Sequence, residues 1–186
     1  HNAYISMEKN ENYYDYDNLG PDTIKFTLLD DNNAMLKGYN NGELDFIENL
    51  PVDEIPTYLA SGELEIGDYL GTYYVCFNTE DEVFSDPNIR KAFSLVIDRN
   101  YIVENVSQAG EVPAPNGVND AAGPGSDDFR TVGGSYYSIS EEDYEKNCEE
   151  ARQLLADAGY PNGEGFPTVE YLYNTADNHK KIGEAL

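Results

Sequence analysis

The sequence predicts an α/β fold, and three observations support this prediction. Strand-like and helix-like patterns alternate through the first 79 residues. A capped amphipathic helix follows at 86–99, and a second capped helix begins at Ser140. A strand-like pattern at 168–174 is then followed by a helix-like pattern at 175–186. Such alternation is typical of domains in which helices pack against a sheet.

The first part of the chain contains four segments in which apolar residues alternate with polar ones or aromatic residues cluster, as expected for strands. These segments are 4–10, 23–30, 43–51 and 64–79. Two short helices are expected between them, at 30–42 and 53–62. The first has Asp and Asn residues at its start and Gly42 at its end, which are favoured residues at those positions.

The helix predicted at 86–99 carries the clearest local signals. Asp86 is a favoured N-cap, and Pro87 occupies the first helical position, where its missing N–H costs nothing. Five apolar residues then recur at helical spacing and form one stripe: Ile89, Ala92, Phe93, Val96 and Ile97. A segment at 101–107 repeats this pattern. We therefore expect this region to be scaffold that packs on a core.

The same helix holds two arginines, Arg90 and Arg99, in a chain with only 11 basic residues. Acidic residues lie close to them in the sequence. We expect local ion pairs with these acids, which contribute little stability when exposed: Asp86, Asp98 and Glu104. Contact with a ligand is the alternative role for the arginines.

The C-terminal part begins with a long connection. Residues 108–139 are rich in Gly, Pro, Asn and Ser, which predicts a surface loop. Ser140 and Asp143 then form a capping-box pattern before an apolar stripe at helical spacing. Gly159 and Pro161 are expected to end this helix.

The composition limits the classes of function. Thirty-six acidic residues against 11 basic ones give a formal net charge of −25. A surface this negative repels the phosphates of nucleic acids and anionic membranes, so we expect no nucleic-acid partner. It suits a cationic or zwitterionic ligand. No apolar run approaches the roughly 18 residues that a membrane-spanning helix needs.

Motifs for catalysis or cofactor binding are missing from the sequence. The two histidines, His1 and His179, have no metal-ligand spacing, and there is no glycine-rich phosphate loop or nucleophile elbow. Acidic pairs are too common to mark a hydrolase. We therefore expect neither an enzyme nor a cofactor. The two cysteines, Cys76 and Cys148, are expected to be buried free thiols, with a disulfide as the alternative.

Several motifs occur in a fixed order along almost the whole chain. KNENYYDYDNLGPDTIKFTLLDD is followed by GYNNGELDFIENLP, and then by TYYVCFNTEDEVFSDPNIRKAFSLVIDRNYIVENV. AGEVPAPNGV and ARQLLADAGYPNGEGFPTVEYLYNTADNHKKIGEAL continue the order. Together they resemble the extracellular solute-binding proteins of peptide ABC transporters, family 5, the oligopeptide- and dipeptide-binding class. One departure is Tyr14, where the family usually has tryptophan.

This resemblance implies a two-lobed periplasmic-binding-protein-like fold (type II, cluster C), of which the chain is a central fragment spanning parts of both lobes. We expect residues 1–76 to belong to lobe I and residues 77–186 to lobe II, truncated at its C-terminus. Family members are longer than this chain and carry a lipoprotein signal that it lacks. The implied location is extracytoplasmic, as a cell-surface lipoprotein or in the periplasm.

The function that the resemblance implies is non-catalytic capture of oligopeptides or dipeptides outside the membrane and their delivery to ABC transporter permease subunits. Two alternatives stay open. The same fold binds another solute, such as a nickel chelate or an oligosaccharide, or the chain is an acidic cell-surface interaction module without a small ligand.

The candidate ligand-binding segment is the crossover between the lobes, because hinge strands of two-lobed binding proteins border the cleft. Alternation along a strand sends Tyr74, Cys76 and Asn78 to one side and the intervening residues to the other. Which side faces the ligand is left open, and ordinary core packing is the alternative for the whole segment. The candidate ligand-binding residues are Tyr73, Tyr74, Phe77 and Asn78; no catalytic residue and no metal ligand is expected.

Overall fold

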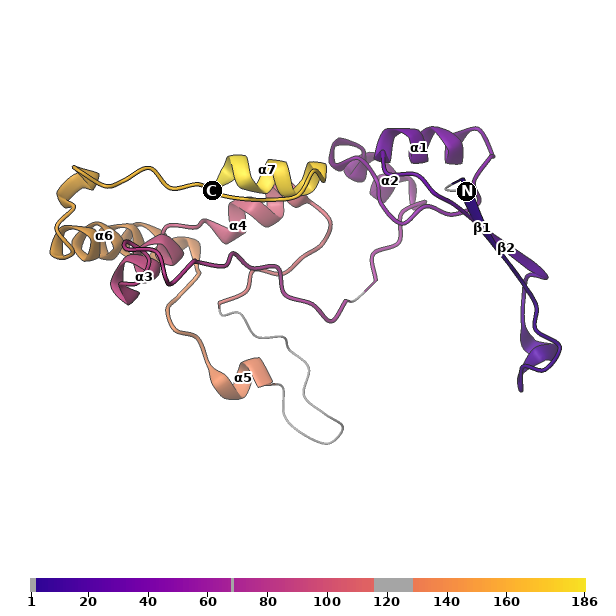
Figure 1. Cartoon of the computed structure of the whole chain (residues 1–186), viewed down its shortest axis with the longest axis horizontal. Coiled ribbons are helices and arrows are strands. Elements are labelled where there is room, and N and C mark those ends of the chain that lie inside the picture. The colour runs from indigo at the N-terminus through magenta and orange to yellow at the C-terminus, as the bar shows by residue number, and fades with distance from the viewer. Residues whose placement is uncertain (1–2, 68, 116–128) are drawn as a thin grey trace. The chain divides into compact units, whose positions relative to one another are not determined.

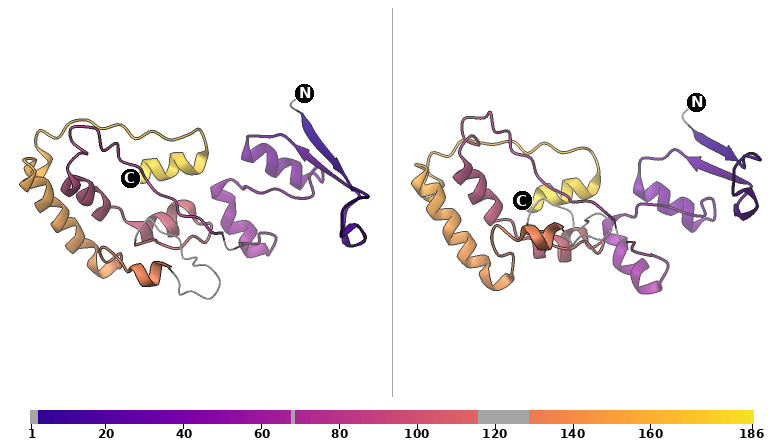
Figure 2. Two further views of the ribbon diagram at one scale, coloured as in Figure 1. Left: turned by 60° about the horizontal axis from the view of Figure 1, so that its bottom comes forward. Right: turned by 90° about the horizontal axis from the view of Figure 1, so that it is seen from below.

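The structure is a computed structural model that describes residues 3–67, 69–115 and 129–186. The chain divides into two compact units, His1–Pro51 and Val52–Leu186. Figure 1 labels the helices and strands, and Figure 2 shows them from two further directions. This division does not test the boundary between the two lobes that we expect between residues 76 and 77, and that boundary stays a prediction.

The smaller unit begins with a two-stranded antiparallel sheet. Strand β1 (Tyr4–Glu8) pairs with β2 (Thr23–Thr27), and Ile5 lies opposite Phe26. A short 3-10 turn, η1 (Tyr16–Asn18), lies in the connection between the strands. Both strands predicted in this region are therefore confirmed, although each is shorter than its sequence pattern.

Helix α1 (Asn32–Asn40) follows the sheet and confirms the helix predicted at 30–42. The Asp31 carboxylate accepts a hydrogen bond from the Ala34 N–H at 2.6 Å, so the predicted acidic cap is present. Gly42 lies just beyond the helix with φ 72°, a left-handed conformation that glycine adopts without steric cost.

The larger unit opens with a short helical segment and ends with another helix. The turn η2 (Val52–Glu54) runs into α2 (Ile55–Ser61), which confirms the helix predicted at 53–62. The last helix is α7 (Asp177–Ala185). Lys181 on α7 forms an ion pair with Asp53 on η2 at 2.7 Å, so the beginning and the end of this unit are in contact.

The helix predicted at 86–99 is shorter in the structure and is followed by two more helical segments. Helix α3 (Pro87–Leu95) starts where expected, and the Asp86 carboxylate accepts from the Asn88 N–H at 2.7 Å. One turn, α4 (Arg99–Tyr101), leads directly into a π-helical turn at Ile102–Ser107. The break arises because Asp98 forms a second N-cap, accepting from the Tyr101 N–H at 2.9 Å.

The long helix of the larger unit is α6 (Glu141–Asp157). The Ser140 hydroxyl donates to the Asp143 carboxylate at 3.0 Å, so these two residues interact through their side chains rather than through the reciprocal backbone bonds of a capping box. Gly159 follows with φ 96°, and the Tyr160 N–H closes the helix end on the Leu155 carbonyl at 2.8 Å. The predicted C-terminal stop is therefore confirmed.

The core of the larger unit lies between α3 and α6, which run side by side in every view of Figures 1 and 2. Its centre consists of Ala92, Leu95 and Ala151, each 1% exposed. The two alanines leave room for the helices to approach closely, so that Leu95 is enclosed. Burial of one leucine side chain contributes about 2 kcal/mol to folding. Partly buried side chains surround this centre: Tyr137, Leu154 and Leu155.

Three segments predicted as strands do not form strands among the described residues. They are 43–51, 64–79 and 168–174, which lack a regular ladder of backbone hydrogen bonds. The apolar alternation of these segments is compatible with a strand, but a strand needs a neighbour to pair with. The loop predicted at 108–139 contains one short helix in its described part, α5 (Phe129–Gly133).

No helix in the described part of the chain is both long enough and apolar enough to cross a membrane.

Candidate functional site

The candidate segment, Tyr73 to Asn78, is one extended run in the larger unit, and its two sides differ in exposure. Tyr74, Cys76 and Asn78 are exposed, whereas Val75 and Phe77 are half-buried. From Tyr74 to Asn78 the side chains therefore alternate in exposure, with one face open to solvent, whereas Tyr73 departs from the alternation because 52% of its surface is exposed. Tyr74 is the most prominent side chain of that open face, with 68% of its surface exposed.

Tyr73 lies half-exposed and is held by aromatic neighbours from the C-terminal part of the unit. Its ring meets His179 of α7 edge-on, with the ring centroids 5.4 Å apart. Burial, followed by hydrogen bonding to Tyr171, raises the pKa of Tyr73 to about 12. The Tyr73 hydroxyl therefore stays protonated at any physiological pH and acts as a neutral hydrogen-bonding group.

Phe77 belongs to an aromatic cluster that extends to α3. Its ring lies 5.0 Å from Phe84 and 6.2 Å from Phe93, and Phe84 and Phe93 are 5.3 Å apart. Phe93 also contacts Phe166 at 5.6 Å. Such tilted and edge-on contacts are the favourable geometries for aromatic rings. They fix the orientation of the segment and thereby direct the neighbouring residues outward.

Asn78 ends the segment by forming a turn. Its side-chain oxygen accepts from the Glu80 N–H at 3.2 Å, and its backbone carbonyl accepts from the Asp81 N–H at 3.2 Å. An asparagine that bonds to the backbone two residues later is a common turn-former. The Asn78 side chain is thus exposed, but its oxygen is already used within the protein.

Arg90 and Arg99 both donate to backbone carbonyls. Arg90 donates to the carbonyls of Phe84 and Ser85 at 2.7 and 3.0 Å. Arg99 donates to the carbonyls of Ser94 and Ile97, each at 3.1 Å, and to the Tyr137 hydroxyl at 2.6 Å.

The prediction that these arginines form local ion pairs is wrong. Among the described residues, neither guanidinium pairs with an acid, and the neighbouring Asp86 and Asp98 cap helices instead. The scaffold role predicted for the region of Arg90 and Arg99 agrees with these contacts.

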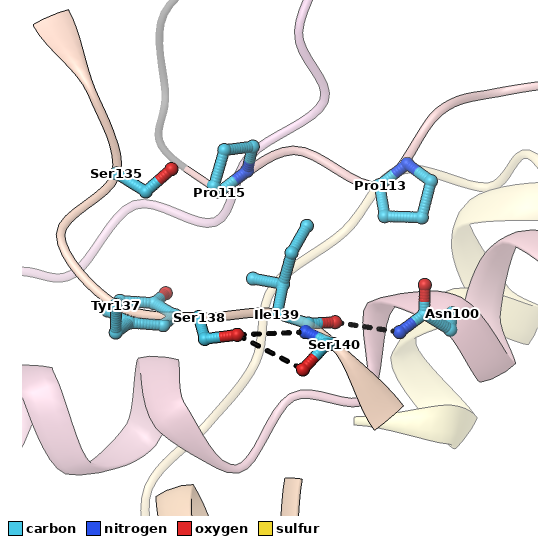
Figure 3. Close-up of a pocket in the computed structure, with 8 residues that line it drawn as sticks. All are labelled: Asn100, Pro113, Pro115, Ser135, Tyr137, Ser138, Ile139 and Ser140. Carbon is cyan, nitrogen blue, oxygen red and sulfur yellow. Dashed lines mark hydrogen bonds between the residues drawn. The ribbon is translucent and has the colours of Figure 1, made fainter. Parts of the chain in front are cut away.

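A shallow pocket of about 770 Å³ lies next to α4, and Figure 3 shows the residues around it. The two prolines lie on one side, and the run from Tyr137 to Ser140 lies on the other. Asn100 donates to the Ile139 carbonyl at 2.8 Å, and the hydroxyls of Ser138 and Ser140 bond to each other at 3.1 Å. The lining residues are Asn100, Pro113, Pro115, Ser135, Tyr137, Ser138, Ile139 and Ser140.

This pocket does not coincide with the candidate segment, because none of Tyr73, Tyr74, Phe77 and Asn78 lines it. Its lining carries no charged side chain, and three of its polar side chains bond within the wall itself. Among the described lining residues, no side chain carries a charge opposite to that of a peptide terminus.

The cysteines are free, and Cys76 is exposed while Cys148 is half-buried. The expectation of buried thiols is thus wrong for Cys76, because it lies on the outward face of the candidate segment. Within the described residues, no group of three or more His, Cys, Asp or Glu side chains is arranged to hold a metal ion.

Two residues that contact the segment were missed by sequence reasoning, namely Tyr171 and His179. A signal for them existed. Gly183 follows His179 by four residues on the same face of α7, and a Cβ atom there would lie 3.0 Å from the Tyr171 ring. A glycine within an amphipathic helix thus marks the close approach of a tyrosine-rich segment.

Comparisons of this sequence with known proteins all indicate the same family. The sequence profile described as "Bacterial extracellular solute-binding proteins, family 5 Middle" matches residues 1–186. The oligopeptide-binding protein OppA of Bacillus subtilis is 32% identical over 190 residues, covering 100% of this chain and 34% of that protein. The dipeptide-binding protein DppE of the same organism is 32% identical, with 100% and 33% covered.

Solved structures agree with the sequence matches. The murein tripeptide binding protein MppA of Escherichia coli superposes with a TM-score of 0.81 at 29% identity, over 99% of this chain and 35% of that one. Haemophilus influenzae OppA in complex with RPPGFSPFR gives a TM-score of 0.75 at 27% identity, over 99% and 35%. The predicted α/β, periplasmic-binding-protein-like fold class is thereby confirmed.

The chain spans about a third of the length of the curated relatives that it matches. The match nevertheless extends over every residue of the chain, and it agrees with the order of motifs in the sequence. The chain belongs to the bacterial extracellular solute-binding proteins, family 5.

Proposed function

We propose that the full-length protein captures oligopeptides or dipeptides outside the cytoplasm and delivers them to the permease of an ABC importer. The observation that carries this proposal is the end-to-end match to relatives named as oligopeptide- and dipeptide-binding proteins. The role is binding and release rather than catalysis. The protein is either anchored as a lipoprotein or free in the periplasm, and mass spectrometry of the mature N-terminus decides between the two.

The exposed face of the candidate segment is the proposed ligand contact. Tyr74 offers a ring to a peptide side chain or backbone, and Asn78 offers its amide N–H₂ beside it. Tyr73 and Phe77 support this surface from behind, because each is packed against aromatic neighbours. A formal net charge of −25 additionally attracts peptides with a positive charge.

Isothermal titration calorimetry on the full-length protein tests the proposal. A set of di- to oligopeptides with cationic, neutral and anionic side chains is titrated at constant ionic conditions. We expect heat of binding with peptides, and tighter binding of the cationic ones. Heat with an oligosaccharide or a nickel chelate, and none with any peptide, would replace peptide capture by another solute.

Other solutes are tested in the same experiment, because relatives named for other ligands also match. The probable deoxycholate-binding protein YgiS of Escherichia coli is 27% identical over the whole chain. Heme-binding protein A of Haemophilus influenzae is 33% identical over 50% of it. Titrations with deoxycholate and heme therefore accompany the peptides.

Substitution of Tyr74 tests the candidate segment. We expect Tyr74→Ala in the full-length protein to weaken peptide binding about tenfold, equivalent to about 1.4 kcal/mol, with an unchanged unfolding temperature. Tyr101→Ala is the matched control, because Tyr101 is a half-exposed tyrosine of the same unit. Unchanged affinity of Tyr74→Ala would remove this residue from the site.

The isolated 186-residue chain is expected to bind peptides weakly or not at all, since it spans a third of its relatives. Affinity equal to that of the full-length protein would show instead that the chain holds a complete site.

A further inference from the structure

The chain carries many carboxylates and few basic side chains that could pair with them. Thirty-six acidic residues stand against 11 basic ones. Ion pairs between described side chains reach only six acids, namely Asp22, Asp53, Glu145, Glu149, Glu150 and Glu184. These pairs involve exposed carboxylates, and exposed pairs contribute little stability. Most of the described carboxylates therefore have no ion pair with another described residue.

Some of the scarce basic side chains bind neutral groups instead of acids. Arg90 and Arg99 donate to backbone carbonyls. The Lys25 ammonium group lies over the Tyr4 ring, with Nζ 4.8 Å from the ring centroid. At least three of the 11 basic side chains are thus engaged by neutral groups, which leaves fewer to pair with carboxylates.

Helix α6 connects this excess of acids to the core of the larger unit. The helix contains seven acidic residues and two basic ones. Glu141, Glu145 and Glu149 recur every four residues and line one exposed face, where Arg152 contacts the last two. Another face of the same helix carries the buried Ala151. Like charges four residues apart destabilise a helix, so repulsion acts on the element that closes the core.

The range of the repulsion decides which carboxylates act at a given salt concentration. The screening length is about 30 Å at 0.01 M salt, about 10 Å at 0.1 M and about 3 Å at 1 M. Carboxylates on successive helical turns, with Cβ atoms about 5–6 Å apart, therefore still repel at 0.1 M, whereas more distant ones repel only in dilute solution. Unfolding separates the charges, so the repulsion favours the unfolded state and added salt favours the folded one.

We propose that the stability of this protein depends on salt, because monovalent cations weaken the repulsion among the carboxylates of the folded larger unit. The effect is one of ionic strength, so Na⁺ and K⁺ act alike. Salt also weakens the exposed ion pairs, but these are few and each contributes little. The protein is therefore suited to saline surroundings, whichever solute it binds.

Thermal unfolding of the full-length protein, followed by circular dichroism in NaCl and in KCl, tests this proposal. We expect the unfolding temperature to rise by about 5–10 °C between 0.01 and 1 M salt, by the same amount with either cation. An unfolding temperature that stays constant or falls with salt would overturn the proposal. A rise with one cation alone would overturn it too, because it assigns the effect to a bound ion.

Two matched variants separate charge from burial. One replaces five exposed glutamates of the larger unit by glutamine, and the other replaces the same five by aspartate, which keeps the charge; the positions are Glu63, Glu80, Glu82, Glu104 and Glu164. We expect the glutamine variant to gain less from salt than the wild type, and the aspartate variant to gain as much. Equal gains in all three proteins would assign the effect to strengthened apolar burial and would contradict the proposal.

Discussion

The helix pair α3–α6 and the two extended segments at 73–77 and 168–173 are contrasting parts of one unit. The helices enclose Ala92, Leu95 and Ala151 at 1% exposure each. The extended segments are also rich in apolar residues, yet Tyr74 and Leu172 are 68% and 94% exposed. A helix satisfies its own backbone hydrogen bonds, whereas a strand depends on a neighbour that is distant in sequence. Among the described residues, the helices therefore satisfy their own backbone groups, whereas no backbone hydrogen bond joins either extended segment to another segment.

The largest expected effect concerns the buried centre of the helix pair. We expect Leu95→Ala in the 186-residue chain to lower the free energy of unfolding by about 2–5 kcal/mol, because it removes a buried side chain and leaves a cavity. Leu172→Ala, at an exposed position, should change it by less than about 0.5 kcal/mol. Denaturant unfolding followed by circular dichroism measures both. Similar losses in the two variants would remove the contrast between the regions.

A smaller effect is expected at the turn between α3 and α4. Arg99→Lys loses the planar guanidinium group that bonds two carbonyls and the Tyr137 hydroxyl, and we expect a loss of about 1–3 kcal/mol in the free energy of unfolding. Arg152→Lys is the control, since the partners of Arg152 within the described residues are the exposed Glu145 and Glu149 on its own helix. If both variants unfold at the same denaturant concentration, the bonds of Arg99 do not stabilise the helix pair.

The ion pair between the helices should contribute less. Lys91 on α3 contacts Glu150 on α6 at 2.5 Å, and both side chains are nearly half-exposed. A double-mutant cycle with Lys91→Met and Glu150→Gln is expected to give a coupling free energy below about 1 kcal/mol. A coupling as large as the effect of Leu95→Ala would mean that charge, rather than the apolar centre, holds the helices together.

The smallest expected effect concerns Tyr73 and appears only at alkaline pH. Because the pKa of Tyr73 is raised from 10.0 to about 12, the folded state favours the protonated hydroxyl. The stability from this shift is fully present below pH 10.0 and is lost as pH rises towards 12. The free energy of unfolding, measured with denaturant across this pH window, should therefore fall less steeply for Tyr73→Phe than for the wild type. Identical slopes would show that burial and the bond to Tyr171 do not raise the pKa of Tyr73 in solution.

The sequence predicted the helices well because their signals are local. Asp31, Asp86 and Asp98 cap helices, and Gly42 and Gly159 follow helix ends in left-handed conformations. One error was the single helix at 86–99, because the capping role of Asp98 was read as that of an ion-pair partner. The strands predicted at 43–51, 64–79 and 168–174 do not form among the described residues. Alternation shows that one face of a segment could be buried, but it does not show whether another strand lies beside the segment.

The candidate site was predictable only in part. Alternation gave the two sides of the segment at 73–78, and the structure adds that the side with Tyr74 is the open one. The contacts of Tyr73 with Tyr171 and His179 join residues roughly a hundred positions apart, and no local pattern encodes such a meeting. The family resemblance supplied the proposed function, because the side chains of the segment have no chemistry that identifies a ligand by itself.

The way in which Arg90 and Arg99 are held has a consequence for tolerance to dissolved ions. Both guanidinium groups bond to neutral carbonyl oxygens rather than to carboxylates. Mobile counterions weaken the attraction between exposed opposite charges, with a Debye length of about 10 Å at 0.1 M and about 3 Å at 1 M, but they scarcely weaken a bond to a backbone dipole at close contact. The turns at both ends of α3 should therefore keep their shape from dilute buffer to brine, even while the strongly acidic surface around them collects cations.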